Sequence, residues 1–235
     1  MRNLVGQTLP RCMLLACLMS APSLTQGAQP GVGLNAEFEV EFLTSIIDHH
    51  FSALRMTELA AGTDPTRNPP IDREQEGVAR TPGFDRTPPK AHMSEIRSMS
   101  RRANRVQREE ILAAQGFLRD WYGVEHEPRI TQTDRRRLRL LEEAEPGAEF
   151  EHLFLEILGR HHYGAVVMAN QCLVAADLEH HELMRYCRSI TNQVEEIDEM
   201  RHMLCEHFGI CDYQPLRGLR GRHTGSEGEV DSPDE

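Results

Sequence analysis

The sequence lacks the positive charge and the short motifs on which several common functions depend. Its 26 basic residues are outnumbered by 37 acidic ones, which gives a formal net charge of −11. General nucleic-acid binding is therefore not expected, because phosphate groups are held by a basic face. The motifs GxSxG, HExxH and CxxC and a phosphate-binding loop are also absent, so we assign no enzyme activity.

Long apolar runs are missing as well, and the run near the N-terminus is short. It covers residues 12–19, well below the roughly 20 apolar residues that a membrane span needs. It follows two arginines and precedes small and polar residues up to Ala28, which is typical of a secretory signal. We therefore predict a signal peptide over residues 1–28, export to the periplasm and no membrane span. Lipoprotein anchoring at Cys17 is the alternative.

Removal of this leader leaves four cysteines, Cys172, Cys187, Cys205 and Cys211. An even number of cysteines in an exported chain favours disulfides. Cys172 and Cys187 are placed to face each other across a helical hairpin, and Cys205 and Cys211 to join the end of the last helix to the residues after it. Buried free thiols and thiolate metal ligands are the alternatives.

The pattern that says most about function is HHxxAxxM, which occurs twice. The copies run from His49-His50 to Met56 and from His161-His162 to Met168, each with a phenylalanine seven residues upstream of its first histidine. On a helix, positions i, i+4 and i+7 share one face, so the first histidine, the alanine and the methionine of each copy form a stripe. Imidazole and thioether groups together make a soft metal-ligand set.

Apolar spacing and proline content divide the rest of the chain. We predict helices over about 35–61, 91–122, 148–176 and 181–208, and a shorter arginine-rich helix that is capped by Thr133 and ends near Glu145. The domain is thus predicted over residues 35–210, as a first hairpin (35–122) with a proline-rich insertion (62–90), a linker (123–147) and a second hairpin (148–208). Residues 214–235 are acidic and glycine-rich, and we predict that they are disordered.

A second repeat relates the later helix of each hairpin. The motif QxxEI occurs at residues 107–111 and again at residues 193–197. Two hairpins that each carry one apolar stripe bury those stripes by packing together. We therefore predict an all-α protein built as a four-helix bundle from two duplicated hairpins.

Helical spacing brings further metal-binding residue types beside the second HHxxAxxM copy. Glu196, Met200 and Met203 share one stripe of the last helix, and the hairpin turn places His162 level with Glu196. We predict that six residues converge on a metal ion: His161, His162, Met168, Glu196, Met200 and Met203. His49, His50 and Met56 are the corresponding candidates in the first hairpin. Thioethers favour Cu(I), and imidazole with carboxylate extends the choice to Cu(II), zinc or iron, so copper is the predicted ion and buffering, storage or tolerance the predicted role.

Two other functions fit parts of the pattern. In a structural or protein-binding helical module, the histidines and methionines only specify the core, and Glu196 only orients a buried imidazole. A di-iron carboxylate bundle uses ExxH on two helices, and Glu149–His152 and Glu199–His202 have that spacing. Both of these lie in the second hairpin, however, and the first hairpin has no clear carboxylate counterpart.

These motifs resemble those of the DUF305 family. The resemblance covers about Glu41 to Phe208 and is strongest over residues 154–204, where the matching positions are His161, His162, Ala165, Met168, Ala169, Gln193, Glu196, Ile197 and Met200. It implies a ferritin-like helical domain of exported bacterial proteins, some of which bind copper through methionine and histidine. The first copy departs from the pattern, since Ala114 stands at the position of Met200 and the proline-rich insertion replaces a short turn. We therefore expect the tighter metal site in the second hairpin.

Overall fold

Six helices make up the part of the chain that the structure describes, which comprises residues 36–64, 77–175 and 178–211 of a computed structural model. They are α1 (Ala36–Ala61), α2 (Ser94–Tyr122), α3 (Gln132–Glu143), α4 (Ala148–Leu173), α5 (His181–Thr191) and α6 (Gln193–Phe208). These residues contain no β-strand, only an isolated bridge between Thr63 and Val78. The predicted all-α fold is confirmed. The predicted signal peptide and acidic tail lie outside the described residues.

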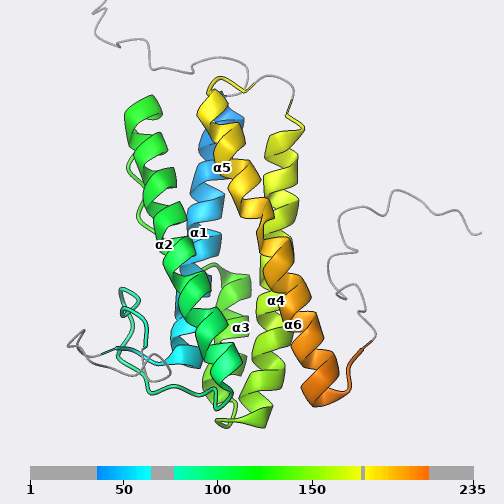
Figure 1. Ribbon diagram of the computed structural model, residues 1–235. Helices are drawn as coiled ribbons and strands as arrows, with labels where there is room; N and C mark the ends of the chain where they lie inside the picture. Colours follow the sequence, from blue (N-terminus) through cyan, green and yellow to red (C-terminus); the bar gives the residue numbers. More distant parts are fainter. Residues whose placement is uncertain (1–35, 65–76, 176–177, 212–235) are drawn as a thin grey trace, which may run out of the picture.

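The long helices form two hairpins that pack side by side (Figure 1). In the first hairpin α1 lies against α2, and in the second α4 lies against α5 and α6. The hairpins meet through α1 and α4, and the short helix α3 packs against both of these. This arrangement is compatible with the predicted four-helix bundle, with α5 and α6 sharing the fourth position.

The last predicted helix is broken at Asn192. The N–H of Asn192 bonds the carbonyl of Ser189, and the N–H of Glu195 bonds the carbonyl of Asn192. These bonds to the third residue back replace the regular helical ladder over one turn. The break changes which residues face inward: a continuous helix places Val194 in the apolar stripe, whereas Val194 is 52% exposed.

Two apolar clusters fill the bundle. The cluster nearer the start of α4 includes Ala53, Met56, Met99, Phe150, Phe154, Met200 and Met203. The cluster nearer the start of α1 includes Phe42, Ile46, Leu118, Ala165, Cys172 and Leu183. On α4 the His-His pair falls between the two clusters, and on α1 it lies near the end of the second cluster, before Ala53 and Met56 of the first. We call these four residues, His49, His50, His161 and His162, the histidine layer.

The helix α3 is closed at both ends by specific polar groups. Thr131 caps its start, not the predicted Thr133, because the Thr131 side chain accepts the N–H of Asp134 at 3.1 Å. The last carbonyls of a helix have no partner within it. Lys90, the final residue of the predicted insertion, donates to three carbonyls at this end, those of Leu141, Glu142 and Ala144.

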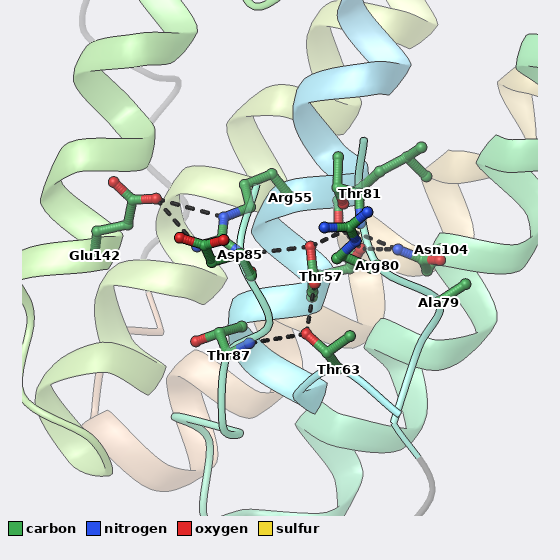
Figure 2. Close-up of polar contacts among 12 residues, drawn as sticks. Arg55, Thr57, Thr63, Ala79, Arg80, Thr81, Asp85, Thr87, Asn104 and Glu142 are labelled. Carbon is green, nitrogen blue, oxygen red and sulfur yellow. Dashed lines mark hydrogen bonds and ion pairs between the residues drawn. The ribbon is translucent and has the colours of Figure 1, made fainter. Parts of the chain in front are cut away.

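The second half of the proline-rich insertion, residues 77–90, is held against the bundle, and we call it the clasp segment (Figure 2). Arg55 of α1 lies 3.3 Å from carboxylate oxygens of Glu58 and Glu142, and it also donates to the carbonyl of Asp85. Glu58 is fully buried and accepts the N–H of Thr81 at 3.0 Å. The clasp segment is therefore part of the packed structure and not a loose surface loop.

Two disulfides join the four cysteines of the second hairpin in the predicted pairs. Cys172–Cys187 links α4 to α5, and Cys205–Cys211 links α6 to the residues that follow it. Structural disulfides persist in oxidising compartments, so these bonds are consistent with export. None of the described helices is both long and apolar enough to cross a membrane.

Candidate metal centre

The two copies of the His-His motif meet in the middle of the bundle. The rings of His49 and His161 stack, with centroids 3.6 Å apart and planes 16° from parallel. Nε2 of His49 donates to the backbone carbonyl of His161 at 2.9 Å, and Nε2 of His161 lies 2.8 Å from Oγ of Ser52. The Ser52 hydroxyl already donates to the carbonyl of His49, so it accepts from His161. Nδ1 of His161 is left as a buried acceptor without a partner.

The second histidine of each pair contacts the QxxEI glutamate of its own hairpin. Nε2 of His162 lies 2.7 Å from a carboxylate oxygen of Glu196, in agreement with the prediction that the hairpin turn brings these two residues to the same height. Nε2 of His50 lies 2.9 Å from a carboxylate oxygen of Glu110. Because a carboxylate only accepts, Glu196 accepts the hydrogen bond that Nε2 of His162 donates. His50 and Glu110 are close in space, but their facing atoms do not form a hydrogen bond. Nδ1 of both rings is buried without a partner. A carboxylate behind an imidazole is also the arrangement that orients metal-binding histidines.

The stacked histidines stay neutral at ordinary pH. Burial, followed by repulsion from His50, lowers the pKa of His49 to about 3. Burial, followed by repulsion from His49 and His162, also holds the pKa of His161 well below its ordinary value. A neutral imidazole keeps the nitrogen lone pair that metal binding needs.

The candidate methionines divide between the two apolar clusters. Three of them are buried in the cluster nearer the start of α4, namely Met56, Met200 and Met203. Met168 is only partly buried and packs against the other cluster. Sδ of Met200 lies 3.9 Å from the point where a Cβ on Gly159 would stand. Since Gly159 precedes His162 by about one helical turn, Met200 is the methionine beside the His162–Glu196 pair.

The predicted ligands do not form one coordination shell. Among the residues that the structure describes, no group of three His, Cys, Asp or Glu side chains is arranged to hold a metal ion. The structure instead brings His162 to Glu196 and His49 to His161, and it leaves Met168 apart. The residues still fit a metal that prefers imidazole nitrogen, because Nδ1 of three buried rings has no hydrogen-bond partner: His50, His161 and His162.

The sequence analysis assigned no site role to several residues that surround these histidines. Glu110 is the counterpart of Glu196, and Ser52 fixes the ring of His161. Gln107 and Gln193, the first residues of the two QxxEI motifs, line a cavity between α2 and α6. The repeat itself carried the signal for Glu110, because a residue that pairs with the second histidine in one hairpin has an equivalent in the other.

The ExxH pairs of the di-iron alternative lie near the surface. The side chains of His152 and His202 are 38% and 81% exposed, and each lies 3.8 Å from the glutamate four residues further along its own helix. Glu199 is hydrogen-bonded to Arg102 of α2. The two motifs therefore do not face a shared interior site.

The fold and the site together define an all-α protein whose two helical hairpins share a buried histidine layer. The chain belongs to the DUF305 family, described as a domain of unknown function, whose model matches residues 85–204, about half of the chain. The match covers α2 to α6 and so contains the second HHxxAxxM copy but not the first.

Two solved structures align with this chain, and the second of them shares its fold. CopM in the Cu(I)-bound form aligns with a TM-score of 0.49 and 20% identity, over 71% of this chain and 94% of that chain. CopM in the Cu(II)-bound form aligns with a TM-score of 0.50 and 20% identity, over 70% of this chain and 93% of that chain. No curated protein matches the sequence at a significant level.

Proposed function

We propose that the protein is an exported metal-binding protein that holds copper at its histidine layer, for buffering, storage or tolerance. The observation that carries this proposal is the state of His161 and His162. Each ring is buried and has Nε2 engaged, by Ser52 or by Glu196, while its Nδ1 has no partner. A buried acceptor without a partner is costly, and a bound metal ion satisfies it.

The second hairpin offers the better ligand set. His161 and His162 supply imidazole nitrogen, Glu196 holds the ring of His162, and Met200 adds a thioether one helical turn away. This mixture of imidazole and thioether suits copper, which such ligands bind in either oxidation state. Met168 and Met203 complete the set only after their side chains rearrange.

The first hairpin offers less. Nδ1 of His50 has no partner and Met56 is fully buried nearby in the sequence. The residue equivalent to Met200, however, is Ala114, which provides no ligand. His49 is engaged by the backbone of His161 and by the ring stack. We therefore propose that His49, His50 and Met56 form a weaker site or act only in packing.

Two further observations support a copper-binding role. The CopM structure that aligns with a TM-score of 0.50 is described as Cu(II)-bound, so a chain with this helical arrangement accommodates the ion. The two disulfides suit the oxidising space outside the cytoplasm, where copper handling by an exported protein takes place.

Copper titration against a competing chelator tests the proposal. We expect the metal-free protein to take Cu(I) from a chelator of moderate affinity, and the double variant H161N/H162N to lose this binding. The matched control is H202N, because His202 lies on the same hairpin but is 81% exposed. Absence of copper binding by the wild-type protein, or equal binding by H161N/H162N, contradicts the proposal.

A structural role for the same histidines is the second candidate, and it also rests on a specific observation. The hydrogen bonds of His161 and His162 and the burial of Met56, Met200 and Met203 are those of a specified core. In that case H161N/H162N loses stability in urea, while the wild-type protein fails to retain copper. Measuring unfolding and copper binding on the same variants separates the two roles.

A further inference from the structure

A cavity of about 330 Å³ lies between α2 and α6. Its walls carry the equivalent residues of the two QxxEI motifs, Gln107 and Glu110 from α2 and Gln193 and Glu196 from α6. The duplicated sequence thus supplies the cavity with two carboxylates and two amides from facing helices.

The two amide side chains are buried without any hydrogen-bond partner. Gln107 is 2% exposed and Gln193 is 6% exposed, and neither the oxygen nor the nitrogen of either amide is engaged. Buried polar groups in folded proteins almost always have a partner. Both amides line the cavity, so a ligand within it reaches them.

The charge of the cavity is strongly acidic. Glu110, Glu195, Glu196 and Glu199 line it, with Arg102 as the lining cation. Nε of Arg102 lies 4.0 Å from a carboxylate oxygen of Glu196, and its guanidinium is hydrogen-bonded to Glu199. A water molecule satisfies the amides but leaves this negative charge in place, whereas a cation binds the two amide oxygens and also offsets the negative charge.

We propose that this cavity binds a hard divalent cation through the carboxylates of Glu110 and Glu196 and the amide oxygens of Gln107 and Gln193. Such all-oxygen sets suit Mn²⁺, Ca²⁺ and Mg²⁺, whereas imidazole and thioether select softer ions. Nε2 of His50 lies 2.9 Å from the carboxylate of Glu110, and Nε2 of His162 lies 2.7 Å from that of Glu196. Without the ion, the guanidinium of Arg102 supplies the positive charge beside Glu196 and Glu199. We expect this side chain to move away when the ion binds.

The site goes beyond the proposed copper function and does not rest on it, although Glu196, which holds the ring of His162 in the copper set, is a ligand of this site. Its amides take no part in the copper set, and its ligands come from both hairpins. A cation here ties α2 to α6, so its binding also strengthens the contact between the hairpins.

Titration of the chelator-treated, full-length protein with Mn²⁺, followed by calorimetry and electron paramagnetic resonance, tests the site. We expect one class of tight sites in the wild-type protein and a loss of affinity of about tenfold or more in Q107L/Q193L, a scale typical of lost metal-site partners. This double variant keeps the net charge, so the loss is not a general electrostatic effect. R102Q is expected to bind Mn²⁺ more tightly, because it removes a competing cation.

The control variant is D198N, which removes an exposed charge from α6 outside the cavity and is expected to bind Mn²⁺ as the wild type does. Equal Mn²⁺ affinity in Q107L/Q193L and the wild type overturns the site, as does binding weaker than millimolar in both the wild type and R102Q. Copper titration of Q107L/Q193L keeps the two proposals apart. Copper binding that survives while Mn²⁺ binding is lost supports the cavity site, and Mn²⁺ binding without copper binding overturns only the copper function.

Discussion

His49 and His161 occupy equivalent positions in the two repeats and stack on each other at the centre of the bundle, with ring centroids 3.6 Å apart. The flanking contacts repeat on each side, since His50 meets Glu110 as His162 meets Glu196. The internal duplication of the sequence therefore corresponds to an approximate duplication in space. The stack lies where the two halves meet.

The first prediction concerns pH. The pKa of His49 in the folded chain, about 3, lies below its ordinary value of 6.5. Above pH 6.5 the ring is neutral in both the folded and unfolded chains. Below it, only the unfolded chain takes up the proton, so the free energy of unfolding falls by about 1.4 kcal/mol per pH unit for such a ring, until the pH reaches the folded pKa. Urea titrations at several pH values between 7.5 and 5 measure this slope.

Two variants provide the comparison for this pH dependence: H161Q, at the ring that stacks on His49, and H202Q, at an exposed histidine. H161Q removes a buried ring whose pKa is held well below its ordinary value, so we expect a shallower dependence on pH. H202Q changes a ring that is 81% exposed and keeps the wild-type slope. Identical slopes in the wild type and H161Q show that the histidine layer does not govern acid sensitivity.

The second prediction concerns the disulfides. Cys172–Cys187 closes a loop with a sequence separation of 15, and its removal in C172A/C187A is expected to lower the free energy of unfolding by about 3 kcal/mol. Cys205–Cys211 closes a separation of only 6 at the end of α6, so C205A/C211A costs less, roughly 2 kcal/mol. Urea unfolding of both variants and of the reduced wild type gives the three values. A larger loss in C205A/C211A contradicts the expected order.

The third prediction concerns the clasp segment. Arg55→Met leaves the fully buried Glu58 without its nearest cation, and breaking a buried pair in this way costs about 3 kcal/mol. We also expect trypsin to cleave faster after Arg80 and Arg86, because the segment loses an anchor. Limited proteolysis and urea unfolding measure the two effects.

The matched control for the clasp is Arg119→Met. Arg119 pairs with Asp120 at the surface, where it is 57% exposed, and such a pair contributes about 0.5 kcal/mol or less. Equal losses in the two variants, or unchanged cleavage in the Arg55 variant, indicate that the clasp segment is held by other contacts.

The fourth prediction concerns the orphaned amides. In the metal-free protein, Gln193→Met replaces an amide without a partner by an apolar side chain of similar shape, and we expect the free energy of unfolding to rise by about 1 kcal/mol. Gln115→Met is the opposite case, because the Gln115 amide donates to the carbonyl of His126 at 3.0 Å, and its loss lowers stability. Thermal unfolding of both variants decides the matter, and a destabilised Gln193 variant shows that this amide has a partner within the protein.

The sequence predicted the helices because their apolar residues recur at helical spacing. It also predicted that His162 lies beside Glu196, because a short turn joins the two helices that carry them. The cysteine pairs followed for the same reason. Long-range features escaped it: the contact of Arg55 with Glu142 and the stack of His49 on His161 depend on how separate elements dock. The break at Asn192 also escaped, because nothing in the apolar spacing interrupts there. For the site, residue types alone grouped Met168 with Met200, although the packing assigns them to different clusters.

Through Lys90, the insertion in the first hairpin contributes to the structure of the linker, which limits how the insertion can be shortened in evolution. Lys90 is the last residue of the insertion that the second hairpin lacks, and it closes the end of a helix in the linker. A deletion of the whole insertion removes this lysine and leaves three carbonyls at the end of α3 without their donor. The insertion can therefore be shortened without loss of this cap only where the deletion spares Lys90.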